Sequence, residues 1–277
     1  MKSLFILLAL VTALALMSCA SKPPVEAVPE IPPPPIVVAA VPTVDAGVAK
    51  NKITSIALSS SCAKTSFKNR GVPPKGYIKG ISLSFARAIC NKETGAVKAM
   101  LKPLGSPKSD ALAWYGLDVR LENLFALLIG SAGRESSWRY CCGRDTSASN
   151  YSSSTSEAGL YQTSYNASSS SPELPKLFQA FKAGGAGCFA EEYQSGIRCS
   201  SGDLKNWGTG DGLVFQKLSK DCPGFATEFS AIVVRNLRSH YGPIIRKEAQ
   251  VLPVCVSMFE QIKKAIEAEP ALCGGIK

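Results

Sequence analysis

Glu135 is the residue whose position best suits acid catalysis. The apolar residues before it recur at helical spacing, at Leu121, Leu124, Phe125, Leu128 and Ala132. A period of 3.6 residues places the Glu135 carboxyl where this stripe ends, so we expect it to be half buried. Partial burial and the negative end of the helix dipole both raise the pKa of a carboxyl, which can then protonate the leaving oxygen of a glycosidic bond. The competing interpretation is a solvated carboxylate paired with Arg134 or Arg139.

Two short motifs around this glutamate resemble those of a known superfamily. Glu-Ser-Ser-Trp at 135–138 and Ala-Gly-Leu-Tyr-Gln at 158–162 are similar, in this order, to the Glu-Ser and Gly-Leu-Met-Gln signatures of soluble lytic transglycosylases and goose-type lysozymes. The resemblance is confined to residues 121–167. It implies a mainly α (α+β), lysozyme-like fold with a small β-hairpin lip beside the active-site groove. It also implies cleavage of the β-1,4 bond between N-acetylmuramic acid and N-acetylglucosamine in peptidoglycan.

The resemblance assigns roles to residues at matching positions. It makes Glu135 the catalytic acid and Ser136 a neighbour that hydrogen-bonds it. The bend that would line the sugar-binding cleft consists of Gly159, Leu160, Tyr161 and Gln162. Trp138 and Tyr161 are candidates for sugar contact because they flank the motifs and aromatic faces pack on sugar rings. Tyr165 is a further candidate for the cleft wall.

The chain departs from the family in the residues that would act after the glycosidic bond is protonated, when water or the muramic 6-hydroxyl attacks the sugar. Ser164 stands where goose-type enzymes carry an aspartate, and the Ala-Tyr-Asn-Ala-Gly segment of transglycosylases has no counterpart at the right place. Asp145 and Glu157 are the candidates for a second carboxylate that activates water. Hydrolysis would leave a reducing end, as in a lysozyme, whereas attack by the muramic 6-hydroxyl would leave a 1,6-anhydro sugar, as in a lytic transglycosylase. We favour the lysozyme and keep both outcomes open, as we do the acetylated or deacetylated state of the glycan.

The beginning of the chain predicts export. Residues 1–18 have a lysine followed by an apolar stretch, which is typical of a signal peptide and too short for a lasting membrane span. Leu-Met-Ser-Cys at 16–19 resembles a bacterial lipobox, so Cys19 is the candidate for lipid attachment; cleavage without lipid is the alternative. Residues 19–49 are rich in proline and predict a disordered tether. We therefore expect a lipoprotein of the bacterial periplasm or outer membrane, with a secreted protein as the alternative.

Residues 50–277 are expected to form one lysozyme-like catalytic domain, long enough for a substantial core. Helices are expected at 80–90, 93–101, 111–115, from 118 onward, from 173 to about 184, around 225–237 and at 254–268. Strands are expected only between residues 141 and 166. The glycine-rich stretch 208–212 is expected to be a turn, and Trp207 beside it is expected to be packed, with a sugar contact as the alternative.

Ten cysteines in an exported chain predict disulfides. Cys188 with Cys199 is the expected pair because it closes a short polar loop. The adjacent Cys141 and Cys142 are expected to find separate partners. If Cys19 carries lipid, nine cysteines remain and at least one is unpaired. A metal site and a cofactor are not expected, since the chain has no Cys-x-x-Cys and a single histidine.

The net charge is +10, from 31 basic and 21 acidic residues. A nucleic acid as partner would match the positive sign of this charge, but the predicted export and the lack of a nucleic-acid-binding motif argue against it. Peptidoglycan fits better, because its stem-peptide carboxylates are anionic. His240 has no nucleophile motif nearby, which argues against a Ser-His-Asp site. The alternative to an enzyme is a non-catalytic peptidoglycan-binding lipoprotein that retains the sugar-binding groove without the catalytic activity.

Overall fold

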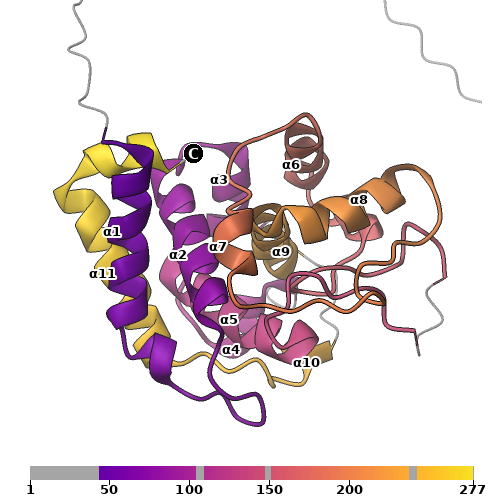
Figure 1. Ribbon diagram of the computed structural model, residues 1–277, viewed down its shortest axis with the longest axis horizontal. Coiled ribbons are helices and arrows are strands. Elements are labelled where there is room, and N and C mark those ends of the chain that lie inside the picture. The colour runs from indigo at the N-terminus through magenta and orange to yellow at the C-terminus, as the bar shows by residue number, and fades with distance from the viewer. Residues whose placement is uncertain (1–43, 104–108, 147–150, 237–241, 277) are drawn as a thin grey trace, which may run out of the picture. The chain divides into compact units, whose positions relative to one another are not determined.

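A long buried helix, α5 (Leu121–Ser136), occupies the middle of the computed structural model and carries Glu135 in its last turn (Figure 1). The structure describes residues 44–103, 109–146, 151–236 and 242–276. Every residue of α5 from position 121 to 133 is buried. The helix therefore packs against neighbours on all of its faces and not only along one apolar stripe. A helix that packs on all faces is held firmly, and its end is therefore a rigid place for a catalytic group.

The other helices form two groups that both pack on α5. α2 (Lys75–Cys90) and α11 (Pro253–Ala268) contact it on one side and also contact α1 (Ala46–Ser59). α9 (Pro223–Asn236) contacts it on the other side and carries α3 (Gly95–Leu101), α6 (Glu173–Lys182) and α8 (Gly210–Asp221). The short helices are α4 (Ala111–Tyr115), α7 (Ala190–Gln194) and α10 (Gly242–Ile245), of which α10 lies against α5.

Aromatic rings fill the space between these helices. Phe85, Phe125 and Phe259 form one contact cluster, with ring centroids 4.7 to 5.8 Å apart. A second cluster consists of Phe178, Phe181, Phe215, Phe225 and Phe229. The first cluster packs α2 and α11 on α5, and the second packs α6 and α8 on α9. Edge and tilted contacts of this kind add to the stabilisation from burial alone.

The prediction of a mainly helical fold is confirmed, and several boundaries agree. α4 begins after Asp110, whose carboxylate accepts a hydrogen bond from the Leu112 amide at 3.0 Å, as expected of an N-terminal cap. The predicted tether was too long at its C-terminal end, because Asp45 caps α1 and Ala49 is buried in the core. The glycine-rich stretch near residue 210 begins α8 instead of being only a turn.

The predicted β-hairpin is not present in the described residues 141–146 and 151–166. The segment holds only an isolated antiparallel bridge between Ala158 and Thr163. Serine and threonine side chains there bond the local backbone instead: Ser152 Oγ accepts from the Thr155 amide at 3.2 Å, and Ser156 Oγ donates to the Ser152 carbonyl at 2.8 Å. Such local bonds compete with the ladder of a strand pair, so the segment forms turns.

The predicted Cys188–Cys199 disulfide is wrong. The four disulfides are Cys62–Cys255, Cys90–Cys273, Cys141–Cys199 and Cys188–Cys222. Pairing requires Cα atoms within about 7 Å, and packing brings each of these pairs to between 4.4 and 6.0 Å. Among the described cysteines, Cys142 is free and buried, so the two adjacent cysteines do not both find partners.

The predicted signal peptide, Cys19, most of the tether and His240 lie outside the described residues. Of the helices that the structure describes, none combines the length and the apolar character needed to cross a membrane.

Candidate active site

The C-terminal end of α5 turns sharply just after Glu135. Ser137 and Trp138 both have positive φ angles, of 52° and 60°, and the Trp138 amide donates to the Ala132 carbonyl at 3.1 Å. This turn folds the indole back under the helix, where its Nε1 donates to the Ile129 carbonyl at 2.9 Å. Gly133 makes room for the ring, since a Cβ there would lie 2.7 Å from it. Trp138 is only 2% exposed, so the prediction that it contacts sugar is wrong; it packs beneath the site.

Helix α10 lies directly beside the Glu135 carboxyl. A Cβ added to Gly242 would come within 3.1 Å of Glu135 Oε1, and Gly242 has a φ of 54°, which favours glycine. The Tyr115 hydroxyl donates to the Pro243 carbonyl at 3.3 Å and ties this segment to α4. The carboxyl itself is half buried, as the helical spacing predicts.

The surroundings of Glu135 raise its pKa from the ordinary 4.5 to about 7. Burial is the largest cause, because it disfavours the charged form. The negative charges of Glu157 and Glu248 raise the pKa further, whereas the positive charges of Arg246 and Arg70 lower it. A carboxyl with a raised pKa keeps its proton to a higher pH than an ordinary glutamate, which is the state that a general acid requires.

A group of arginines joins the end of α5 to the segment after α10. Arg70 donates to the Arg134 carbonyl at 3.2 Å, and Arg134 donates to the Glu248 carbonyl at 3.1 Å. Arg246 binds the Glu248 carboxylate through two contacts, at 2.7 and 3.1 Å. Arg134 thus bonds a backbone carbonyl rather than the Glu135 carboxyl. The sequence provided no signal for this group, because its members come from distant segments.

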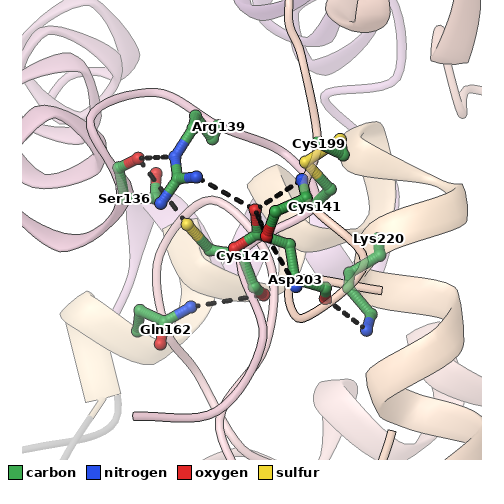
Figure 2. The surroundings of a disulfide bond; sticks show 9 residues. Ser136, Arg139, Cys141, Cys142, Gln162, Cys199, Asp203 and Lys220 are labelled. Carbon is green, nitrogen blue, oxygen red and sulfur yellow. Dashed lines mark hydrogen bonds and ion pairs between the residues drawn. A yellow bond between two sulfur atoms is a disulfide. The ribbon is translucent and has the colours of Figure 1, made fainter. Parts of the chain in front are cut away.

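The bend at residues 159–162 is attached to the end of α5. The Ser136 hydroxyl lies 2.8 Å from the Leu160 carbonyl and 3.1 Å from the Ala132 carbonyl, so it links the bend to the helix rather than bonding Glu135 as expected. On the other side, the Cys142 carbonyl accepts from the Gly159 amide at 2.8 Å. Figure 2 shows the second contact to this carbonyl, from Gln162 at 3.5 Å.

The side chains of the bend are mostly turned inward. Leu160 and Tyr161 are buried, so the prediction that their side chains line a cleft is wrong. The Tyr161 hydroxyl lies 3.4 Å from both the Tyr77 and the Thr227 hydroxyls, in a buried network beneath the site. Gln162 is half buried. The bend supports the site through its backbone and places few of its own side chains at the surface.

Tyr165 belongs to a short 3-10 helix, η3 (Tyr165–Ser170), at the other end of the bend. Its ring packs on Phe178 and Phe215, with centroids 5.3 and 6.1 Å away, and its hydroxyl donates to Asp211 at 3.4 Å. These contacts hold Tyr165 to α6 and α8, and none of them joins it to Glu135.

The two candidates for a second carboxylate differ in their surroundings. Glu157 is half buried, immediately before the bend, and its charge is the largest electrostatic influence on Glu135. Asp145 is exposed and is not among the groups that shift the pKa of Glu135. Of the two candidates, Glu157 is therefore the one whose charge acts on Glu135.

Comparisons of the chain with protein-family models, with curated proteins and with solved structures found no match. The resemblance to lysozyme-like enzymes therefore rests on the sequence motifs at 135–138 and 158–162. In the part of the chain that the structure describes, no group of three or more His, Cys, Asp or Glu side chains is placed to hold a metal ion.

Proposed function

We propose that the protein is a muramidase with a lysozyme-like fold, which cuts the β-1,4 bond between N-acetylmuramic acid and N-acetylglucosamine in peptidoglycan. The observation that carries the proposal is the Glu135 carboxyl, half buried at a rigid helix end, with a pKa raised to about 7. A glycosidase needs a carboxyl in this protonated state to donate to the leaving oxygen. The attachment of the family-like bend to the same helix end, through Ser136, supports the assignment.

The mechanism uses two carboxyl groups in different states. Glu135 protonates the glycosidic oxygen as the bond breaks. Glu157, on the segment just before the bend, acts as the base that activates water for attack on the sugar. We favour hydrolysis, with a reducing end as product, and keep the 1,6-anhydro product of a lytic transglycosylase as the alternative. The negative charge of Glu157 also helps to keep Glu135 protonated, since like charges repel.

Export and attachment belong to the same proposal. Peptidoglycan lies outside the cytoplasmic membrane, so an enzyme that cuts it needs a signal such as residues 1–18. Lipid attachment at Cys19 would keep the folded part close to the wall, with the proline-rich residues as a tether.

The test is the release of soluble fragments from purified peptidoglycan by the protein and by Glu135→Gln. We expect the protein to lower the turbidity of the suspension and Glu135→Gln to leave it unchanged. Glu267→Gln, which alters an exposed glutamate on α11, is the matched control and should remain active. Mass spectrometry of the fragments then distinguishes reducing from 1,6-anhydro ends, and acetylated and deacetylated substrates are compared in parallel. Binding without any soluble fragment would refute the enzyme and leave the non-catalytic wall-binding protein.

A further inference from the structure

Two exposed aromatic rings lie against the guanidinium of one half-buried arginine. The Arg144 guanidinium is 4.5 Å from the centroid of the Trp207 ring and 4.9 Å from that of Tyr151. Tyr151 is 70% exposed and Trp207 is 38% exposed. We call Arg144, Tyr151 and Trp207 the aromatic platform. Trp207 is thus not packed in the core, which was the expectation from the sequence.

A buried glutamine fixes the backbone of the platform. Gln216, on α8, is 1% exposed. Its Oε1 accepts from the Trp207 amide at 2.8 Å, and its Nε2 donates to the carbonyls of Trp207 and Ser153, both at 3.1 Å. A buried amide is stable only when it is hydrogen-bonded in this way. One side chain therefore holds Trp207 and the turn that precedes the bend in a single arrangement.

The loop that leads to Trp207 has further supports. Figure 2 shows the Cys141–Cys199 disulfide, which ties the loop to the chain just after α5. Arg139 pairs with Asp203 at 3.0 Å, and the buried Lys220 ammonium donates to the Asp203 carbonyl, also at 3.0 Å. The disulfide, the Arg139–Asp203 ion pair and the buried side chains of Lys220 and Gln216 thus hold a surface loop that ends in an exposed ring. Rigid presentation of a ring lowers the entropy lost when a ligand stacks on it.

The platform lies close to the candidate active site. Arg144 follows Cys142 by two residues, and the Cys142 carbonyl bonds the Gly159 amide of the bend at 2.8 Å. Two residues of chain span at most about 7 Å. The platform is therefore close to the bend, and a polymer that passes the bend on this side meets it.

We propose that the aromatic platform is a glycan-binding subsite that holds the peptidoglycan chain beyond the bond that is cut. Trp207 and Tyr151 stack on sugar rings, since exposed aromatic faces suit the apolar faces of pyranoses. Arg144 pairs with a stem-peptide carboxylate, because the planar guanidinium donates two parallel hydrogen bonds to such a group. The net charge of +10 suits an anionic polymer. This inference rests on the proposed function, which supplies peptidoglycan as the ligand.

The experiment measures binding in the absence of turnover. Every variant is made in the Glu135→Gln background and pelleted with purified peptidoglycan sacculi over a range of concentrations. We expect Trp207→Ala and Tyr151→Ala each to raise the dissociation constant roughly tenfold. Leu204→Ala is the matched control, because Leu204 is 55% exposed on the same loop but has no ring; it should bind normally.

The charge of the ligand is tested separately with Arg144→Gln. This variant should weaken binding to sacculi and leave binding to chitin, a neutral glycan, nearly unchanged. Equal loss on both polymers would overturn the role of the carboxylate. Thermal unfolding verifies that each variant is folded, and Tyr151→Ala disturbs packing least, since that ring is mostly in solvent and loses only its contact with Arg144.

The subsite and the proposed function fail in different ways. If Trp207→Ala and Tyr151→Ala bind sacculi as Leu204→Ala does, the subsite is refuted, whether or not the protein with Glu135 intact releases fragments. If the two variants lose binding while the protein with Glu135 intact releases nothing, the glycosidase is refuted and the platform stands as a wall-binding site.

Discussion

Replacing Glu135 by glutamine should remove the proposed catalytic acid and at the same time stabilise the fold, with the stabilisation confined to neutral and alkaline pH. The folded protein raises the pKa of this carboxyl from the ordinary 4.5 to about 7. Below pH 4.5 the group is neutral in both the folded and the unfolded chain, so it costs no folding free energy. Between pH 4.5 and 7 the unfolded chain ionises first, and the free energy of unfolding of the natural protein falls as the pH rises. Above pH 7 the carboxyl is ionised in both states, and the folded protein bears the full cost of a buried charge. Glutamine carries no charge and avoids this cost.

The size of the effect follows from the pKa. Each tenfold change in an ionisation constant corresponds to about 1.4 kcal/mol, so a rise from 4.5 to about 7 is worth roughly 3 kcal/mol at most. The carboxyl is partly exposed, which reduces this figure, and we expect about 1 to 3 kcal/mol. For a domain of this length, that corresponds to about 2 to 4 °C in Tm for each kcal/mol.

The assay compares unfolding of the protein and of Glu135→Gln at pH 4 and pH 8 with the disulfides intact. The substitution changes the free energy of unfolding at each pH. The increase at pH 8 minus the increase at pH 4 isolates the effect of Glu135 ionisation from other effects of the amide. Glu267→Gln, on the surface of α11, should show no such difference between the two pH values. A gain that is equal at pH 4 and pH 8, or a loss at pH 8, would refute the burial of the carboxyl and with it the argument for a protonated acid.

Three further outcomes follow from the same contacts. Activity should fall above about pH 7 as Glu135 loses its proton. In a Glu157→Gln variant with residual turnover, the fall should occur at lower pH, because the loss of a nearby negative charge lowers the pKa of Glu135. Ser136→Ala leaves the buried Leu160 carbonyl without its hydroxyl partner, and denaturant unfolding should reveal a loss of about 1 to 3 kcal/mol together with reduced activity. Peptide mapping without reduction should recover Cys141 joined to Cys199, and replacing both by serine should lower stability by about 4 kcal/mol in the chain-entropy picture.

Local patterns were sufficient to predict the helices whose signals lie within one segment. The spacing of apolar residues predicted α5, and the Asp110 cap predicted α4, since both depend on contacts within one or two turns. The prediction failed between residues 141 and 166, where strands were expected and the described residues hold only one isolated bridge. Short side chains at residues 152–156 bond the nearby backbone and form turns, a competition that the alternation of residue types does not reveal.

The disulfides show why loop length along the chain is a poor guide to pairing. Cys199 is close to Cys188 in sequence, yet it pairs with Cys141, 58 residues away. The pairing depends on how α8 and the segment after α5 pack, and these belong to different parts of the chain. The same packing leaves Cys142 enclosed and free.

The amino-acid sequence alone determined that Glu135 ends a buried helix, because hydrophobic spacing and charge act over a few residues. Tertiary structure decided everything that depends on distant segments meeting. It placed α10 against the carboxyl, turned Trp138 and Tyr161 inward, and brought Trp207 to the surface beside Arg144. The physical reason is that burial and electrostatic effects depend on distance in space, which the order of residues along the chain does not specify.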